Sequence, residues 1–283
     1  MSGPVDCASV VLSALMCAPS HFTVRYSINP WMDPNRAVDS ARADQQWRSL
    51  VTALGRRGVH IKLIDQDPAQ PDMVFTANAG LVHGRRVVLS RFASHERRGE
   101  EPRFADWFAR RGYEVMEVGE AFEGAGDASL FRDHVIAGWG WRSTRAGVEA
   151  AAELLGMPCV PLRLTDPRFY HLDTCLSILD SETILWYPAA FDVDAGRALQ
   201  ALCPRLIPIV EPEALQLACN AVTSGRAVYT TGASPRLRCS LAAAGFELHG
   251  LVLDEFLKAG GGARCLTLPL ETYRDESGRT GVV

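Results

Sequence analysis

Five polar residues recur along the 283-residue chain at nearly even intervals, and their types suit covalent chemistry. The intervals between them are 45, 48, 49 and 45 residues. In order, they are Asn78, Glu123, His171, Asn220 and Cys265. A thiol, an imidazole and a carboxylate that meet in one cavity can serve as nucleophile, general acid–base and orienting group. Taken singly, a cysteine is more often a structural thiol and a histidine a satisfied core residue. Their equivalent placement favours the catalytic interpretation.

The residues next to these five support the same interpretation. Three consecutive glycines at 260–262 precede Cys265, and such a run is conformationally costly unless the backbone must approach another group closely. Glu123 opens the small-residue segment Glu-Gly-Ala-Gly-Asp, which ends at Asp127. His171 and Asp173 are two residues apart, so a strand at this point would place both side chains on one face.

The elements that must position these residues form a unit of hairpin, helix and strand that repeats about every 47 residues. Four units begin at residues 74, 122, 169 and 217, with helices expected at 102–111, 145–155, 195–202 and 235–244. The remaining segments supply a fifth unit divided between the two ends of the chain. Its parts are a strand at 263–270, a strand at 10–17, a helix at 41–57 and a strand at 59–64.

Five such units that close into a ring predict a propeller-like α/β domain without free sheet edges. If each first strand faces the ring axis, the five polar residues converge on one cavity. The alternative is an open, doubly wound sheet, but no glycine fingerprint opens a helix after the first strand, and hairpins separate the helices. We therefore expect residues 1–283 to form one catalytic domain with its fifth repeat split between the termini.

Composition excludes several classes of protein. The net charge of -4 gives no general attraction to nucleic acid or to anionic lipid. No stretch approaches the roughly 18 apolar residues of a membrane span, and the apolar segment near residue 10 lacks the flanks of a signal peptide. The eight cysteines form no CxxC pair, so we expect reduced thiols, no metal site and a cytoplasmic protein. The sequence leaves a homodimer open.

Together, four motifs resemble the guanidino-group-modifying superfamily, the penteins. They are Pro-Asp-Met-Val-Phe-Thr-Ala-Asn at 71–78, Phe-Glu-Gly-Ala-Gly-Asp at 122–127, His-Leu-Asp-Thr at 171–174, and Gly-Gly-Ala-Arg-Cys ending at 265. The resemblance covers nearly the whole chain. It implies a five-bladed α/β propeller, in agreement with the repeat count, and an enzyme that needs no metal or organic cofactor.

The resemblance also assigns roles to individual residues. Cys265 would be the nucleophile, His171 the general acid–base, and Glu123 the group that orients His171. Substrate-binding positions of the family fall on the residues Asn78, Asp173, Asp72, Arg97 and Arg145, of which the two arginines match only approximately and could be ordinary surface residues.

Two positions bear on which member of the family the chain resembles. Asp173 can accept hydrogen bonds from an unsubstituted guanidinium, which favours arginine over methylated arginine as the small-molecule substrate. Asn78 resembles the Thr-Ala-Asn of dihydrolases, and an amide can donate to a neutral ureido intermediate. We therefore expect an arginine dihydrolase or deiminase type of hydrolase. The alternatives are a dimethylargininase, then an amidinotransferase, then a catalytically silent pentein that only binds.

Overall fold

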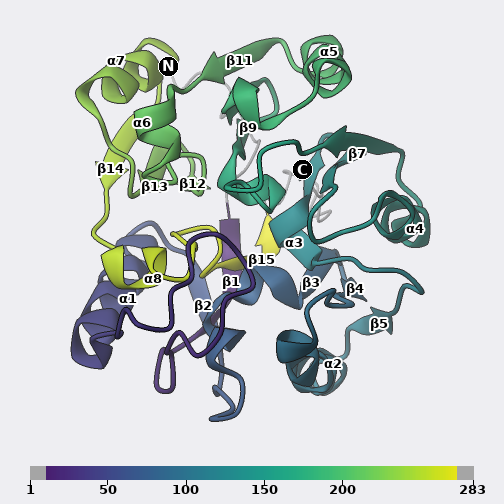
Figure 1. Ribbon diagram of the computed structural model, residues 1–283. Helices are drawn as coiled ribbons and strands as arrows, with labels where there is room; N and C mark the ends of the chain where they lie inside the picture. Colours follow the sequence, from purple (N-terminus) through teal and green to yellow (C-terminus); the bar gives the residue numbers. More distant parts are fainter. Residues whose placement is uncertain (1–10, 273–283) are drawn as a thin grey trace.

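The computed structural model describes residues 11–272, and within them the strands form five three-stranded sheets arranged as a ring (Figure 1). In each sheet the inner strand is antiparallel to the middle strand, which is parallel to the outer strand. From inner to outer strand, the sheets are β3 (Gly80–His83), β4 (Arg86–Leu89) and β5 (Glu114–Met116); β6 (Ala128–Phe131), β7 (His134–Trp139) and β8 (Cys159–Arg163); β9 (Leu176–Asp180), β10 (Thr183–Trp186) and β11 (Arg205–Pro208); β12 (Val222–Ser224), β13 (Ala227–Thr230) and β14 (Glu247–Gly250); and β15 (Leu268–Thr272), β1 (Val11–Cys17) and β2 (His60–Ile64).

A helix joins the middle strand to the outer strand in every sheet and lies on the rim of the ring (Figure 1). These helices are α2 (Glu101–Ala109), α4 (Arg145–Leu155), α5 (Val193–Leu202), α7 (Pro235–Ala243) and α1 (Ser40–Gly55). The predicted helices therefore exist, with ends within two residues of the expected ones. The sequence analysis missed the short helices α6 (Glu211–Ala214) and α8 (Asp254–Leu257) and the 3-10 turns η3 (His95–Glu100) and η5 (Pro188–Ala190).

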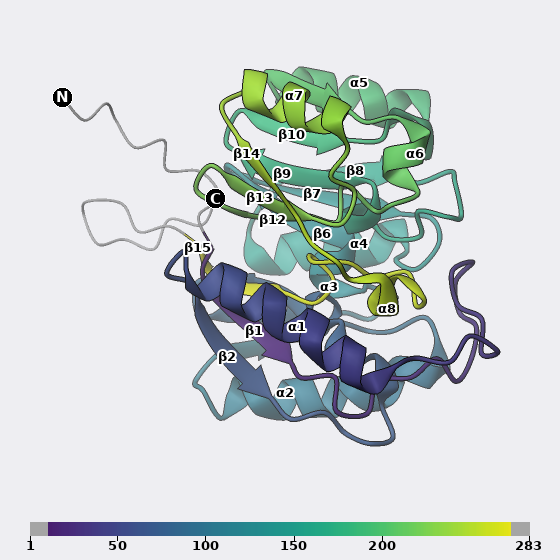
Figure 2. The ribbon, with the colours of Figure 1, turned by 90° about the vertical axis from the view of Figure 1, so that its left-hand side faces the viewer.

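The fifth sheet combines both ends of the described chain. β15 pairs with β1 in antiparallel register, with Leu268 opposite Leu15, and β1 pairs in parallel with β2. In Figure 2, α1 lies across β1 and β2. The predicted first residue of this strand, Val10, lies outside the described residues. The five-bladed α/β propeller expected from the repeats is confirmed.

Helix α4 illustrates how the sequence fixes a blade. Its buried face carries Val148, Ala151, Ala152 and Leu155, which recur at the three- and four-residue spacing of one helix face. Thr144 caps the N-terminus by accepting a hydrogen bond from the backbone N–H of residue 147. The helix therefore cannot extend backwards, and residues 140–143 form the loop that turns towards the ring axis.

One part of the prediction was wrong in detail, because the inner strands begin later than expected. The segment 71–79 forms two 3-10 turns, η1 (Pro71–Val74) and η2 (Thr76–Ala79), and only then does β3 begin. Likewise, η4 (Leu172–Thr174) follows His171, so the strand alternation argued for His171 and Asp173 does not occur. The polar residues lie in the turns that lead into the inner strands.

None of the helices within residues 11–272 combines the length and the apolar character needed to cross a membrane.

Candidate active site

The turns that precede the five inner strands bring the five recurring polar residues together. Asn78 lies in η2, Glu123 precedes the helical turn α3 (Gly124–Asp127), and His171 precedes η4. Asn220 and Cys265 lie in the turns before β12 and β15. All five side chains are buried. The predicted convergence on the ring axis is therefore present, although turns rather than strands produce it.

Cys265 is held by two polar neighbours. Its Sγ lies 3.0 Å from Nδ2 of Asn220, which donates to it, and 3.3 Å from Oδ2 of Asp173, to which the thiol donates. Oδ1 of Asn220 accepts the backbone N–H groups of Gly262 and Cys265, each at 3.1 Å. Asn220 therefore fixes both the sulfur and the loop that carries it.

The glycine run before Cys265 has a steric reason. A Cβ at Gly262 would approach Oδ1 of Asn220 to 2.9 Å, and one at Gly261 would collide with the ring of Phe75. The backbone must therefore pass close to both neighbours, as the run of glycines predicted.

The surroundings of Cys265 oppose ionisation of its thiol. Burial, followed by the nearby Asp173 carboxylate, raises the pKa of the Cys265 thiol well above its usual range. Burial also raises the pKa of Asp173 to about 7. A cation placed between these groups would lower both pKa values, because it would favour the thiolate and the carboxylate.

His171 forms a buried hydrogen bond with Glu123. Its Nε2 lies 2.7 Å from Oε2 of Glu123, while Nδ1 has no hydrogen-bond partner among residues 11–272. A Cβ at Gly126 would collide with the Asn78 amide and lie 3.5 Å from that Nδ1, so glycine is needed here to leave space beside the imidazole. One ring nitrogen is thus held by the carboxylate, and the other remains available for proton transfer.

Arg142 is the second side-chain partner of Glu123, and the sequence did not predict it. It is buried, and its Nη1 donates to both carboxylate oxygens of Glu123, at 3.2 and 3.3 Å. Burial alone would raise the pKa of Glu123, but Arg142 and the hydrogen bond from His171 lower it to about 2. Glu123 is therefore ionised at any ordinary pH and holds His171 in one orientation.

Asp127 supports the turn beneath His171. Its Oδ2 accepts from the Ser143 hydroxyl at 2.6 Å and lies 4.0 Å from Nε2 of His171. Its Oδ1 accepts the backbone N–H of Leu172 at 3.1 Å. Burial raises the pKa of Asp127 to about 6.

Asp72 and Arg97 lie on the opposite side of Asn78 from Glu123. The Arg97 guanidinium is buried and donates to Glu100, to Oδ1 of Asn78 at 2.9 Å and to the backbone carbonyl of Asp72 at 3.2 Å. Oδ2 of Asp72 accepts from the Tyr26 hydroxyl at 2.9 Å. Arg97 therefore belongs to the cluster, and in this state it positions Asn78 and the Asp72 turn.

Arg145, predicted to hold the amino-acid end of a ligand, is not part of this cluster. Its side chain is 60% exposed on α4 and pairs with Glu149 one turn later at 2.8 Å. The Arg145–Glu149 spacing of four residues on an amphipathic helix was the signal that should have indicated a surface position. The arginine that does enter the cluster is Arg142, which lies three residues earlier and before the Thr144 cap. The prediction chose the wrong one of these two arginines.

Three buried polar atoms in this region have no hydrogen-bond partner in the described chain. They are Oδ1 of Asp72, Oδ1 of Asp173 and Nε of Arg142. Buried polar atoms are normally paired, so unpaired ones mark places where a ligand or water can bind. The buried cluster also holds more acidic than basic side chains: Asp72, Glu100, Glu123, Asp127 and Asp173 against Arg97, Arg142 and His171. This charge balance suits a cationic ligand. Within residues 11–272, no group of three or more His, Cys, Asp or Glu side chains has the geometry of a metal site.

Comparisons with known proteins agree with this geometry. Residues 19–272 match the family model described as N,N dimethylarginine dimethylhydrolase, eukaryotic. The bifunctional arginine dihydrolase/ornithine cyclodeaminase AgrE of Nostoc is 45% identical over 93% of this chain, which spans only 38% of that longer protein. The N(G),N(G)-dimethylarginine dimethylaminohydrolase of Mycobacterium tuberculosis is 40% identical over 90% of this chain and 84% of its own.

Solved structures show the same fold. A crystal structure of the N-terminal domain of ArgZ, a cysteine-to-serine mutant bound to its substrate, has a TM-score of 0.89 and 43% identity. The match covers 91% of this chain and 97% of that one, and ArgZ comes from Synechocystis. A dimethylarginine dimethylaminohydrolase structure at 24% identity, with a TM-score of 0.74, shares the fold. The chain therefore belongs to the dimethylarginine dimethylhydrolase family of amidine-cleaving hydrolases, within the pentein superfamily.

Proposed function

We propose that this chain hydrolyses the guanidino group of L-arginine through a covalent adduct on Cys265, in the manner of an arginine dihydrolase. The observation that carries the proposal is Asp173, whose Oδ2 holds the thiol while its Oδ1 is buried without a partner. An unsubstituted guanidinium nitrogen can donate to that free oxygen. The dimethylated nitrogen of asymmetric dimethylarginine has no proton to donate.

In the first half-reaction, the cationic substrate promotes ionisation of the Cys265 thiol that then attacks it. A guanidinium beside Asp173 favours ionisation of Cys265, whose thiol proton passes to Nδ1 of His171, and the thiolate then attacks the guanidinium carbon to form a tetrahedral adduct. His171 donates a proton from Nδ1 to the departing nitrogen, and ammonia leaves an S-alkylthiouronium on Cys265. His171 then removes a proton from water, which attacks the same carbon and releases the thiolate and a ureido product.

A second hydrolysis depends on Asn78. Its Nδ2 donates to the backbone carbonyl of Glu123 at 3.0 Å, and its Oδ1 accepts from Arg97. One hydrogen and one lone pair of the amide remain free for a ligand. A neutral ureido oxygen can accept that hydrogen, whereas a carboxylate at this position would repel it. If the ureido compound is retained, Cys265 can attack its carbon again and expel a second ammonia. Hydrolysis of the resulting thiocarbamate restores the thiol and gives ornithine and carbon dioxide.

Similar proteins support covalent chemistry and this branch of the family. An asparagine-to-serine variant of the ArgZ N-terminal domain has been crystallised covalently bound to a reaction intermediate, at 43% identity and a TM-score of 0.89 to this chain. The chain spans less than two-fifths of the full bifunctional relatives. The proposal therefore concerns only the dihydrolase reaction, because the chain matches the N-terminal domain of ArgZ.

The second candidate function is that of a dimethylargininase. It is favoured by the matching family model over residues 19–272 and by the mycobacterial relative, which this chain matches over most of its length. The amidinotransferase and binding-only alternatives receive less support. The former must exclude water from the intermediate, and the latter does not need a cysteine, a histidine and a glutamate gathered in one buried cluster.

Product analysis separates these functions. Purified protein is incubated with L-arginine and, separately, with asymmetric dimethylarginine, and the products are identified by mass spectrometry. We expect ornithine, carbon dioxide and two equivalents of ammonia from arginine. Citrulline as the end product would indicate a deiminase, and dimethylamine from the methylated compound alone would show that our interpretation of Asp173 is wrong. The Cys265→Ser variant serves as the inactive control.

The proposed steps need only side chains and water, without a metal or an organic cofactor. We also place the protein in the cytoplasm, because the seven cysteines within residues 11–272 are free, as is usual in a reducing compartment.

A further inference from the structure

A second pocket opens at the end of the ring opposite the catalytic turns. The catalytic residues precede the inner strands, whereas this pocket is lined further along those same strands and by the hairpin turn at Arg85. All five inner strands contribute to its wall, so it occupies the ring axis. The volume of this pocket is about 140 Å³.

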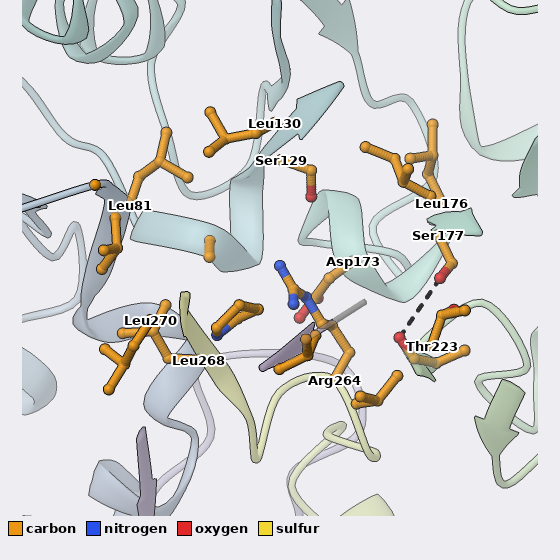
Figure 3. A pocket seen from close by; sticks show the side chains of 18 of the residues that line it. Leu81, Ser129, Leu130, Asp173, Leu176, Ser177, Thr223, Arg264, Leu268 and Leu270 are labelled. Carbon is orange, nitrogen blue, oxygen red and sulfur yellow. Dashed lines mark hydrogen bonds between the residues drawn. The ribbon is translucent and has the colours of Figure 1, made fainter. Parts of the chain in front are cut away.

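The walls of this axial pocket are largely aliphatic. Figure 3 shows Leu81, Leu130, Leu176, Leu268 and Leu270 around it. An apolar cavity of this kind gains free energy when it exchanges water for an apolar ligand body. A multiply charged ion would find too few polar partners on these walls.

The floor of the pocket carries an unpaired arginine. The Arg264 side chain points into the pocket beside Asp173 (Figure 3), and it forms no hydrogen bond or ion pair with any residue in 11–272. Burial lowers the pKa of Arg264, and the nearby Asp173 offsets only part of this effect. A half-buried guanidinium that pairs with no residue in 11–272 has the geometry to bind a carboxylate through two parallel hydrogen bonds.

The charged residues that line the pocket determine which ligand charge it favours. Arg264 and Arg85 oppose a single lining carboxylate, Asp173, so the pocket has a net positive charge when all three are ionised. The substrate cluster on the other side of Asp173 instead contains more acidic than basic side chains. The two ends of the axis therefore favour ligands of opposite charge.

We propose that the axial pocket is a second ligand site, distinct from the substrate site, which binds a small monocarboxylate with an apolar body through Arg264. The carboxylate pairs with the guanidinium, and the body contacts the aliphatic walls. Because Asp173 lines this pocket and also holds the thiol of Cys265, a ligand here alters the reactivity of the nucleophile. A carboxylate beside Arg264 offsets the cation next to the sulfur and makes the thiolate less favourable.

Binding is tested with 4-methylpentanoate as the probe, by calorimetry on Cys265→Ser protein saturated with L-arginine so that the substrate site is filled. We expect binding to persist under these conditions and to be about tenfold or more weaker for the uncharged 4-methylpentanamide. Equal affinity for acid and amide, displacement of the acid by arginine, or no binding at low-millimolar concentration would each overturn the proposal.

Two further measurements locate the site and its effect. Leu130→Trp places a larger side chain in the lining of the axial pocket and should abolish probe binding, while Leu154→Trp on the surface of α4 should not. In wild-type protein the probe should slow alkylation of Cys265 by iodoacetamide several-fold at constant pH. Unchanged probe binding in Leu130→Trp would contradict the assigned site, and an unchanged alkylation rate would contradict the link to Cys265.

Discussion

Oδ2 of Asp173 lies 3.3 Å from Sγ of Cys265, so the nucleophile of this site rests against an acid and not against its general base. Both groups are buried, and burial raises the pKa of each. The pair is therefore poorly ionised until a cation arrives. This arrangement protects the thiol from other electrophiles and couples its activation to substrate binding.

Replacement of Asp173 tests this coupling directly. Asp173→Asn keeps the shape of the side chain but removes the charge that faces a guanidinium, so kcat/KM for arginine should fall by about 10- to 100-fold. Asp106→Asn is the matched control, because that carboxylate is 55% exposed on α2 and pairs with a surface arginine. Steady-state ammonia release measures both variants. Equal losses in the two would show that the role assigned to Asp173 is wrong.

The same residue makes stability depend on pH. The pKa of Asp173 is about 7 in the folded protein against 3.8 for the free side chain, so the folded state binds the proton more tightly. The resulting stability is fully present below about pH 4 and is lost as the pH rises through about 7. The ligand-free protein should therefore show a free energy of unfolding that falls across this window.

Asp173→Asn should make that fall shallower, although Glu100 and Asp127, whose pKa values burial also raises, keep part of it. Urea unfolding at several pH values provides the measurement. A slope identical to that of wild type would mean that Asp173 is ionised in the folded, ligand-free protein.

Cys265 should be the only cysteine whose replacement stops turnover. Cys265→Ser removes the thiolate, and arginine turnover should fall by at least about a thousandfold. Cys203→Ser changes another buried thiol, whose sulfur lies near the backbone of β11, and should keep near-normal activity. Mass spectrometry of quenched wild-type reactions should reveal an adduct on the peptide that contains Cys265. If Cys265→Ser retains turnover, the nucleophile is another group.

The ring and its catalytic trio could be predicted because they leave periodic signals in the sequence. Each blade repeats the same order of elements, and Glu123, His171 and Cys265 recur at that period. The turns that hold them could not be predicted from hydropathy, since a 3-10 turn such as η4 has only three residues and is too short to show a hydrophobic period. The strand assumed at His171 was wrong for this reason.

Arg142 escaped prediction for a different reason. Nothing in the local pattern separates a buried arginine in a loop from an exposed one, because its burial depends on Glu123, which lies in another part of the same blade. The position of Asn220 in the repeat could be predicted from the sequence, but its contacts with Cys265 could not. Those contacts depend on closure of the ring between the last two repeats. Contacts of this kind arise from tertiary structure alone.

Arg142 and Arg145 lie on either side of the Thr144 cap. They provide a matched pair for testing whether the buried arginine has a role that the exposed one lacks. Arg142→Gln removes the main cation beside buried Glu123, so His171 loses its fixed orientation and kcat should fall by about tenfold or more. Loss of one partner of a buried ion pair also costs about 3–5 kcal/mol of stability. Arg142→Lys keeps the charge and should recover part of both losses. Arg145→Gln, on the exposed face of α4, should behave like wild type in turnover and in urea unfolding. Reduced activity in Arg145→Gln alone would restore the original prediction that this residue holds the ligand.

The choice between one hydrolysis and two rests on Asn78, and a single substitution tests it. Asn78→Asp replaces the Nδ2 donor that now faces the backbone carbonyl of Glu123 with an acceptor, and it adds a charge that Arg97 can neutralise. The guanidinium of arginine remains compatible with a carboxylate here, whereas a ureido oxygen is repelled by it. We therefore expect the variant to consume arginine but to accumulate citrulline, with the ratio of ornithine to citrulline reduced at least about tenfold. Time courses followed by mass spectrometry, with citrulline also supplied as a starting substrate, measure this ratio. Asn220→Asp is the contrasting variant, since it places a carboxylate against Sγ of Cys265 and should slow both hydrolyses together. Unaltered ornithine formation by Asn78→Asp would remove Asn78 from the second step.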